Sequence, residues 1–261
     1  MRLSPRLIPF IALAVSLSTV AEDRVISSLG RLEPEDGVVQ LAGPSGGGLT
    51  GSVMKSLEVA EGDWVERNQI VAYLDSYNMR KAEVGRLEAI LTNARSEIVR
   101  QEDLSKRSLT SAANLDTAQM DLDIALADLA AASASLELSV VRSPLRAQVL
   151  DVHAHPGERV GSQGIMELGR TDRMYAVAEV YETDITAIKV GQLATIKAPA
   201  MDKELTGKVE RISLKVGRLD AVGTDPIAKT DARVVEVFIL LDDSETVSRF
   251  TNMQVKVEIQ P

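Results

Sequence analysis

The two histidines of the chain lie close together, in the segment Asp151-Val152-His153-Ala154-His155. In an extended strand alternate side chains point to the same face, so Asp151, His153 and His155 would lie side by side. Two imidazoles and a carboxylate can hold zinc. The same three side chains fit a strand that faces solvent equally well. We adopt this second interpretation and expect no metal site.

Other catalytic arrangements have less support. The chain contains no cysteine, which excludes thiolate catalysis, disulfides and cysteine metal sites. A Ser-His-Asp arrangement would need one of the same two histidines. Five carboxylates lie in a helical region, mainly off its Leu/Ala stripe, as is typical of a solvated or laterally contacting face: Asp116, Asp121, Asp123, Asp128 and Glu137. We therefore expect no catalytic or cofactor-binding residues, and a chain that is not an enzyme.

Two segments far apart in the chain repeat one pattern: a small residue, a valine-containing strand, Gly-Asp/Glu-x-Val and a second strand. The first segment is residues 49–75, with Gly62-Asp63-Trp64-Val65, and the second is residues 142–169, with Gly157-Glu158-Arg159-Val160. This is the half-motif of biotinyl/lipoyl domains, whose two halves pair into a flattened barrel. We predict one lipoyl-like domain, split into these two halves.

A biotin- or lipoate-carrying domain needs a lysine at the tip of the turn between its halves. Met54-Lys55 resembles a biotinylation dipeptide but falls in the first strand of its half, and Lys81-Ala82 opens a helical segment. Neither lysine lies where a ligase could use it. A carrier subunit is therefore the lesser alternative, and we expect no cofactor.

Residues 76–141, between the halves, are strongly helical instead. Apolar residues recur at alternating spacings of three and four, which is the coiled-coil pattern. The stripe of the first arm (76–107) is Val84, Leu87, Leu91, Ala94 and Ile98; that of the second (112–141) is Leu115, Ala118, Leu122, Ala125, Leu129, Ala132 and Leu136. The link between the arms is too short for anything but an antiparallel turn. We predict a protruding hairpin with arms about 45 Å long.

The charges restrict the partners. The net charge is −9 and the pI about 4.9, which argues against a nucleic-acid partner. Residues 112–141 contain no lysine or arginine, whereas the first arm contains seven: Arg80, Lys81, Arg86, Arg95, Arg100, Lys106 and Arg107. We expect these arms to pair within a hairpin and between neighbouring copies.

The N-terminal residues predict export. Arg2 and Arg6 precede an apolar run, Leu7–Ala21, which is the pattern of a secretory signal. The run is shorter than the roughly 20 residues that span a bilayer. Residues 1–23 are thus either a cleaved signal sequence or a retained membrane anchor. Both place the chain in the periplasm, associated with the inner membrane.

The remaining segments read as strands. Five lie in residues 170–261: Met174–Val180, Leu193–Lys197, Gly207–Ser213, Val234–Leu241 and Met253–Ile259. We predict that they form a small antiparallel β-barrel, which residues 24–48 join with short strands around Val25-Ile26 and Val38–Leu41. The predicted fold class is mixed β with a coiled-coil hairpin: a biotinyl/lipoyl-like domain split by the hairpin, plus the C-terminal barrel.

With these elements in this order, the chain resembles the HlyD-type membrane fusion proteins, and among them the DevB-like adaptors of ABC exporters. The resemblance covers nearly everything after residue 24 and is densest in Gly164–Ile185, Asp231–Val237 and Asn252–Ile259. Two features depart from it: Ala147 stands where the second half usually has glycine, and the hairpin is short for the subfamily.

The resemblance implies a periplasmic adaptor that joins an inner-membrane ABC permease/ATPase to a TolC-like outer-membrane channel and assembles with itself, usually as a hexamer. Adaptors that dock such channels carry Arg-x3-Leu-x6-Ser across the hairpin tip, and this chain has Arg100, Leu104 and Ser111 in those places. We expect these three to form the docking site, with Leu104 as a solvent-exposed apolar knob. Alternatively, Arg100 and Ser111 are solvated residues beside the turn, with Ser111 as a helix N-cap. The rival function is a structural coiled-coil envelope protein.

Overall fold

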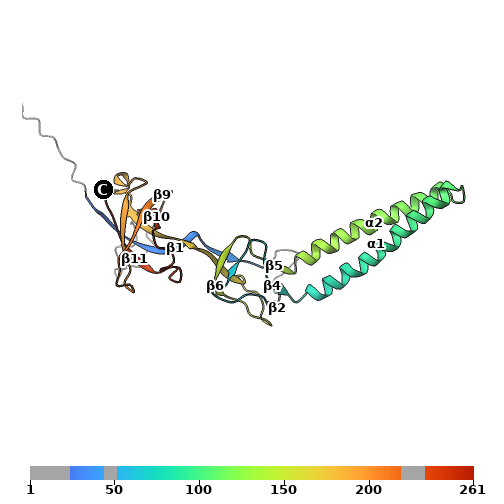
Figure 1. Ribbon diagram of the computed structural model, residues 1–261, viewed down its shortest axis with the longest axis horizontal. Coiled ribbons are helices and arrows are strands. Elements are labelled where there is room, and N and C mark those ends of the chain that lie inside the picture. The colour runs from blue at the N-terminus through green and yellow to red at the C-terminus, as the bar shows by residue number, and fades with distance from the viewer. Residues whose placement is uncertain (1–23, 44–51, 219–232) are drawn as a thin grey trace, which may run out of the picture.

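The computed structural model describes residues 24–43, 52–218 and 233–261. The molecule is elongated, with β-structure at one end and a long helical hairpin at the other (Figure 1). The predicted signal or anchor, residues 1–23, lies outside the described residues. Among the helices that are described, none has the length and apolar character needed to cross a membrane.

Six antiparallel strands close into a barrel in the order β1-β11-β8-β9-β10-β7, with β7 paired back to β1. Their bounds are β1 Ile26–Leu41, β7 Met166–Tyr181, β8 Leu193–Lys197, β9 Leu205–Arg218, β10 Arg233–Leu241 and β11 Gln254–Ile259, with a 3-10 turn at Ile185–Ala187. The predicted alternation of β11 is confirmed: Val255, Val257 and Ile259 are buried, while Gln254 and Lys256 are exposed. One apolar core fills the barrel.

A second apolar core lies between the barrel and the hairpin. Around it, β2 (Met54–Leu57), β4 (Ile70–Leu74) and β5 (Val140–Arg142) form a three-stranded sheet, while β3 (Trp64–Val65) and β6 (Ala147–Val152) extend the large sheet beyond β7. Strands from the two halves of the repeated motif pair with each other, β4 with β5 and β3 with β6. The predicted fold class, β-sheet units with a two-helix hairpin, is confirmed.

Two 16-residue strands, β1 and β7, run through both β units. Leu29–Pro34 pairs with Met174–Glu179 in the barrel, and Val39–Leu41 pairs with Met166–Leu168 beside the second core. Two short strands were expected in place of β1. The chain stays extended because the interruption after Pro34 is absorbed as a register shift, with Asp36 and Gly37 at positive φ.

The hairpin consists of α1 (Tyr77–Lys106) and α2 (Ala112–Glu137). The residues that these helices bury belong to the two predicted stripes: Leu87, Leu91 and Ile98 on α1, Ala118 and Ala125 on α2. Small residues opposite large ones let the two backbones approach closely. The second arm is shorter than predicted, because Val140 and Val141 leave the helix and pair with Tyr73 and Ala72 of β4.

The tip reverses direction through a Schellman cap. The Ser108 N–H donates to the Ser105 carbonyl over 2.9 Å, and the Leu109 N–H donates to the Leu104 carbonyl over 2.8 Å. This cap needs a left-handed residue, and Ser108 takes that place with φ +58°. A side chain in this region is strained by about 1 kcal/mol. The left-handed position of this turn is thus occupied by a serine, although glycine would adopt it with less strain.

We predict that Gly30→Ala destabilises the barrel by about 1–3 kcal/mol, the usual range for overpacking. A Cβ on Gly30 would clash with the Val177 carbonyl and lie 3.0 Å from the Ala178 Cα, so the β1 and β7 backbones would have to separate. Chemical denaturation followed by circular dichroism measures the change. Gly217→Ala is the matched control, since its Cβ would meet nothing within 4 Å. Equal effects of the two substitutions would contradict the prediction.

We also predict that Ser108→Gly stabilises the hairpin by up to about 1 kcal/mol, because glycine adopts the left-handed conformation without strain. The helical signal at 222 nm should then melt at a higher temperature. Ser105→Gly is the control: Ser105 lies inside α1, where glycine costs about 1 kcal/mol. A lower melting temperature for Ser108→Gly would show that the cap does not limit hairpin stability.

Candidate docking site at the hairpin tip

Arg100 and Leu104 lie on one face of α1, four residues apart and close to the turn. The Arg100 side chain is 65% exposed and forms an ion pair with Glu97 at 2.5 Å. Ser111 lies across the turn, is exposed and caps α2: its hydroxyl accepts a hydrogen bond from the Asn114 N–H over 3.2 Å. The N-cap interpretation of Ser111 is confirmed, and it leaves the side chain accessible at the tip.

The expectation that Leu104 is an exposed knob is wrong. Leu104 is partly buried, whereas Leu109 is 68% exposed. The helix continues to Lys106, so Leu104 lies within its last turn, whereas Leu109 follows the Schellman cap and is exposed beyond the helix end. Sequence reasoning missed Leu109. An apolar residue just beyond a helix end that is rich in polar residues was the available signal.

Polar contacts across the turn hold the tip in shape. The Thr110 hydroxyl donates to Gln101 Oε1 over 2.7 Å and accepts from Asn114 Nδ2 over 3.2 Å. Thr110 therefore joins the end of α1 to the start of α2. The side chains of Arg100, Leu109 and Ser111 are presented by a braced turn, which reduces the ordering that a contact would require.

The histidine segment is not a metal site in this geometry. His153 is only 14% exposed, and its two ring nitrogens face different carboxylates: Nδ1 lies 3.6 Å from Asp151 and Nε2 lies 3.4 Å from Glu167. Donors on opposite sides of a ring cannot converge on one ion. His155 lies beside Glu158 and is exposed, as the solvent-facing interpretation expects, whereas His153 on the same face is largely covered. Within residues 24–43, 52–218 and 233–261, no group of three such donors could hold a metal ion.

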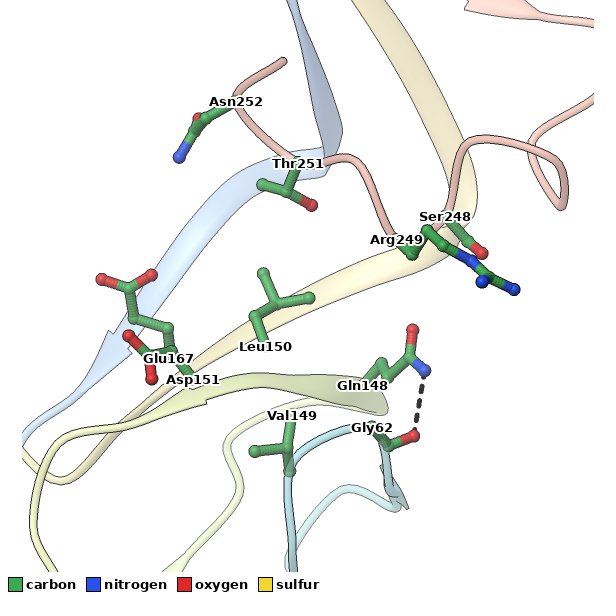
Figure 2. A pocket seen from close by; sticks show the side chains of 10 residues that line it. All are labelled: Gly62, Gln148, Val149, Leu150, Asp151, Glu167, Ser248, Arg249, Thr251 and Asn252. Carbon is green, nitrogen blue, oxygen red and sulfur yellow. Dashed lines mark hydrogen bonds between the residues drawn. The ribbon is translucent and has the colours of Figure 1, made fainter. Parts of the chain in front are cut away.

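A cleft of about 570 Å³ lies beside this segment, between the barrel and the second β unit. Figure 2 shows Leu150 and Thr251 pointing into it from opposite sides, with Asp151 and Glu167 at one end. Arg249 points away from them. The lining includes two hydroxyl side chains, Ser248 and Thr251, and two carboxylates, Asp151 and Glu167.

The carboxylates with displaced pKa values belong to surface interactions. Hydrogen bonds lower the pKa of Glu83 beside Arg86, of Asp243 beside Thr246 and of Glu258 beside Lys256. All three carboxylates are held as anions, which is the opposite of what a general acid requires. On the barrel wall, burial opposes the charge of Arg31, but hydrogen bonds to Glu236 and Glu33 raise its pKa. This arginine is a structural cation.

The candidate lysines of a carrier domain lie together at the base of the hairpin. Lys55 Nζ donates to Asn78 Oδ1 over 2.7 Å, and both Lys55 and Lys81 lie over the Tyr77 ring, 5.2 and 5.8 Å from its centre. Neither lysine occupies the tip of a turn. The connection between the two β halves is the hairpin itself.

Comparison with known proteins agrees with this architecture. Residues 76–140 match the family model "RND MFP, alpha-helical hairpin domain", where MFP stands for membrane fusion protein. The multidrug resistance protein MdtA of Klebsiella pneumoniae is 26% identical over 223 residues, which cover 78% of this chain and 53% of that protein. The chain thus spans about half the length of this relative.

Solved structures of membrane fusion proteins share the fold. A MacA-MexA chimeric protein containing the Pseudomonas aeruginosa MexA α-hairpin domain superposes with a TM-score of 0.71 at 18% identity, covering 91% of this chain and 79% of that one. The membrane fusion protein Spr0693 of Streptococcus pneumoniae gives 0.63 at 19% identity, covering 90% and 98%. Residues 76–140 are therefore similar to the hairpin domain of RND-type membrane fusion proteins, and the chain shares its fold with these solved structures.

Proposed function

We propose that this chain is the periplasmic adaptor of a tripartite exporter, without catalytic activity of its own. The observation that carries the proposal is the hairpin. Its helices pack on each other, make few contacts with the β units and hold a braced, partly apolar tip in solvent. Such a hairpin adds little to the packing of the β units, and its reach suits contact with a distant partner.

In this proposal, Arg100, Leu104 and Ser111, together with Leu109, contact a TolC-like outer-membrane channel. Leu109 supplies exposed apolar area, Arg100 supplies several hydrogen-bond donors, and Ser111 is small enough for close approach. The β units form a ring of copies, a hexamer in the family that the chain resembles, over an inner-membrane pump. Residues 1–23 lead the chain through the inner membrane or anchor it there.

Two classes of inner-membrane pump are candidates for the partner of this adaptor. The resemblance to DevB-like adaptors favours an ABC permease/ATPase, which is the partner that we propose. The label of the hairpin family favours an RND transporter instead. Affinity purification of the adaptor from detergent-solubilised membranes, followed by mass spectrometry, distinguishes them: an ABC ATPase should co-purify. Recovery of an RND permease in its place would overturn the ABC assignment but not the adaptor function.

We predict that Leu109→Asp lowers export at least about tenfold, which corresponds to 1.4 kcal/mol of lost contact. Arg100→Ala and Ser111→Asp should weaken it less. Leu104→Asp should also abolish export, but it places a charge at a partly buried site and is the less clean test. Cargo efflux and cysteine crosslinking of the tip to the channel are measured in cells. Met79→Asp is the control, because Met79 is also apolar and 71% exposed but lies at the hairpin base. Normal export by Leu109→Asp and Leu104→Asp would show that the tip is not the docking site.

We further predict that protein purified from its native host carries no biotin or lipoate. Lys55 and Lys81 lie against Tyr77 rather than at the tip of a turn, so a ligase would not find its usual substrate geometry. Intact-mass measurement checks this. An added mass equal to either cofactor would favour the carrier-subunit alternative.

A further inference from the structure

The end of the barrel away from the hairpin is a rim formed by the starts of β1, β8 and β10 and the ends of β7, β9 and β11. The strand registers bring these ends together: Ile26 pairs with Ile259, Ile259 pairs with Ala194, and Tyr181 pairs with Val234. Figure 1 marks the C-terminus at this end. We call it the distal rim.

Large apolar side chains are exposed all around the distal rim. Val190 is 64% exposed and Leu214 is fully exposed. The members of this group are Val25, Tyr181, Val190, Leu193, Leu214 and Val216. They come from several strands and connections, so no single segment accounts for them. Exposed apolar side chains that gather in this way indicate a contact with another protein or with a membrane.

The backbone on both sides of Val190 holds its side chain outward. Ile188, two residues earlier, is buried in the barrel core. Gly191, directly after it, has φ +99°, and its N–H donates to the Val209 carbonyl over 2.7 Å. Val190 therefore lies at the apex of a fixed turn between these two attachments, where it is exposed by the fold and not by chance.

Leu214 is displaced outward by an irregularity in the pairing of β9 with β10. Ile212 pairs with Val237 and Val216 pairs with Val235, so β9 advances four residues while β10 advances two. The additional residues of β9 have no partners in the ladder and bulge away from it. Leu214 lies in the middle of this bulge, where it projects into solvent.

The distal rim carries positive charge, although the net charge of the chain is −9. Its exposed cations are Arg24, Lys189, Lys215, Arg218 and Arg233. Within residues 24–43, 52–218 and 233–261, none of these five side chains forms an ion pair. Glu182 and Asp184 lie beside them, and Glu258, further down the barrel, is already paired with Lys197 and Lys256. A partner for this rim must therefore be anionic.

The order of these residues in the chain favours a lipid surface over a protein. Lys189 directly precedes Val190, and Lys215 lies between Leu214 and Val216. Lysine is depleted in the cores of protein–protein interfaces. Apolar side chains interspersed with lysine and arginine are typical of elements that lie in the headgroup region of a membrane. Tyrosine, which the rim presents at Tyr181, is also enriched there.

We propose that the distal rim binds the surface of a bilayer that contains anionic phospholipids. Val190 and Leu214 enter the headgroup region, and the rim cations contact lipid phosphates. This contact is distinct from residues 1–23, but the predicted anchor ends directly before Arg24, so a retained anchor would bring the rim to the membrane. The inference rests on the periplasmic location in the proposed function and adds a lipid partner to it.

The test uses the absence of cysteine from the sequence. Full-length chains with Val190→Cys, Leu214→Cys or Leu109→Cys are labelled with a dye whose fluorescence rises in an apolar environment. They are mixed with vesicles of phosphatidylcholine alone, or of equal parts phosphatidylcholine and phosphatidylglycerol. We expect the signal to rise at positions 190 and 214 on the mixed vesicles, and less when salt is raised from about 0.05 to 0.5 M. The label at position 109, on the hairpin tip, is the control and should not respond.

Charge reversal gives a second measurement. A cation beside an anionic surface contributes enough that its removal weakens binding about fivefold. In the chain labelled at position 214, Lys189→Glu should lower the vesicle affinity by at least about this factor. Lys203→Glu is the matched control, because Lys203 is also exposed but lies in the turn between β8 and β9, at the other end of the barrel. Circular dichroism confirms that both variants stay folded.

Two results would overturn the proposal: no rise at positions 190 and 214 on the mixed vesicles, or an equal rise on neutral ones. Lower export by Lys189→Glu without any response to vesicles would also overturn it, and would assign the rim to the pump. None of these results touches the adaptor function, which would fail separately if the tip variants exported normally.

Discussion

The paired strands β1 and β7 are the constraint on which the rest of the molecule depends. Each contributes 16 residues, and together they form part of the barrel wall and of the second β unit. The two apolar cores are therefore joined by one pair of strands, whose pairing is interrupted by register shifts around Glu35 and resumes at Val39. Gly30 marks how close the two backbones come, since a Cβ there would clash with the Val177 carbonyl. Because β1 and β7 belong to both units, the hairpin base on the second β unit is tied to the position of the barrel.

The hairpin is attached to this framework at its base. β4 leads into α1 and β5 follows α2, and these two strands pair, with Ala72 opposite Val141 and Tyr73 opposite Val140. Arg80 of α1 also donates to the backbone carbonyl of Ser135 on α2. The arms therefore leave the sheet already side by side. Beyond the base, the buried Leu and Ile side chains of α1 pack against the Ala-containing stripe of α2. This packing keeps the two helices side by side up to the tip.

Periodicity determined how much of this could be predicted. The apolar stripes of the hairpin recur every three or four residues, and the strands β8, β10 and β11 alternate every two residues. Such local repeats can be recognised in the sequence, and the predicted bounds of these elements lie close to the observed ones. The continuity of β1 and β7 could not be predicted, because Pro34 and Gly37 look like an interruption until a partner strand accommodates the bulge. The burial of Leu104 and the exposure of Leu109 depend on the Schellman cap, whose left-handed residue is a serine and not the usual glycine. His153 was expected to face solvent but is only 14% exposed, and it lies beside Glu167 of the neighbouring strand β7, a contact that local alternation does not reveal.

A single tip is a weak binding element on physical grounds. It offers one exposed leucine, two arginines that are already paired (Arg100 with Glu97 and Arg107 with Asp103) and a few hydroxyls. Exposed ion pairs contribute only about 0.2–1 kcal/mol each. Several tips held in one assembly bind a channel more strongly than a single tip does. Once the first tip has bound, the binding of the others is intramolecular and their effective concentration is high. Such a gain requires that the tips keep a fixed spacing. The pairing of β1 with β7 ties the hairpin base to the barrel, so in this view the β units matter to docking as much as the residues at the tip.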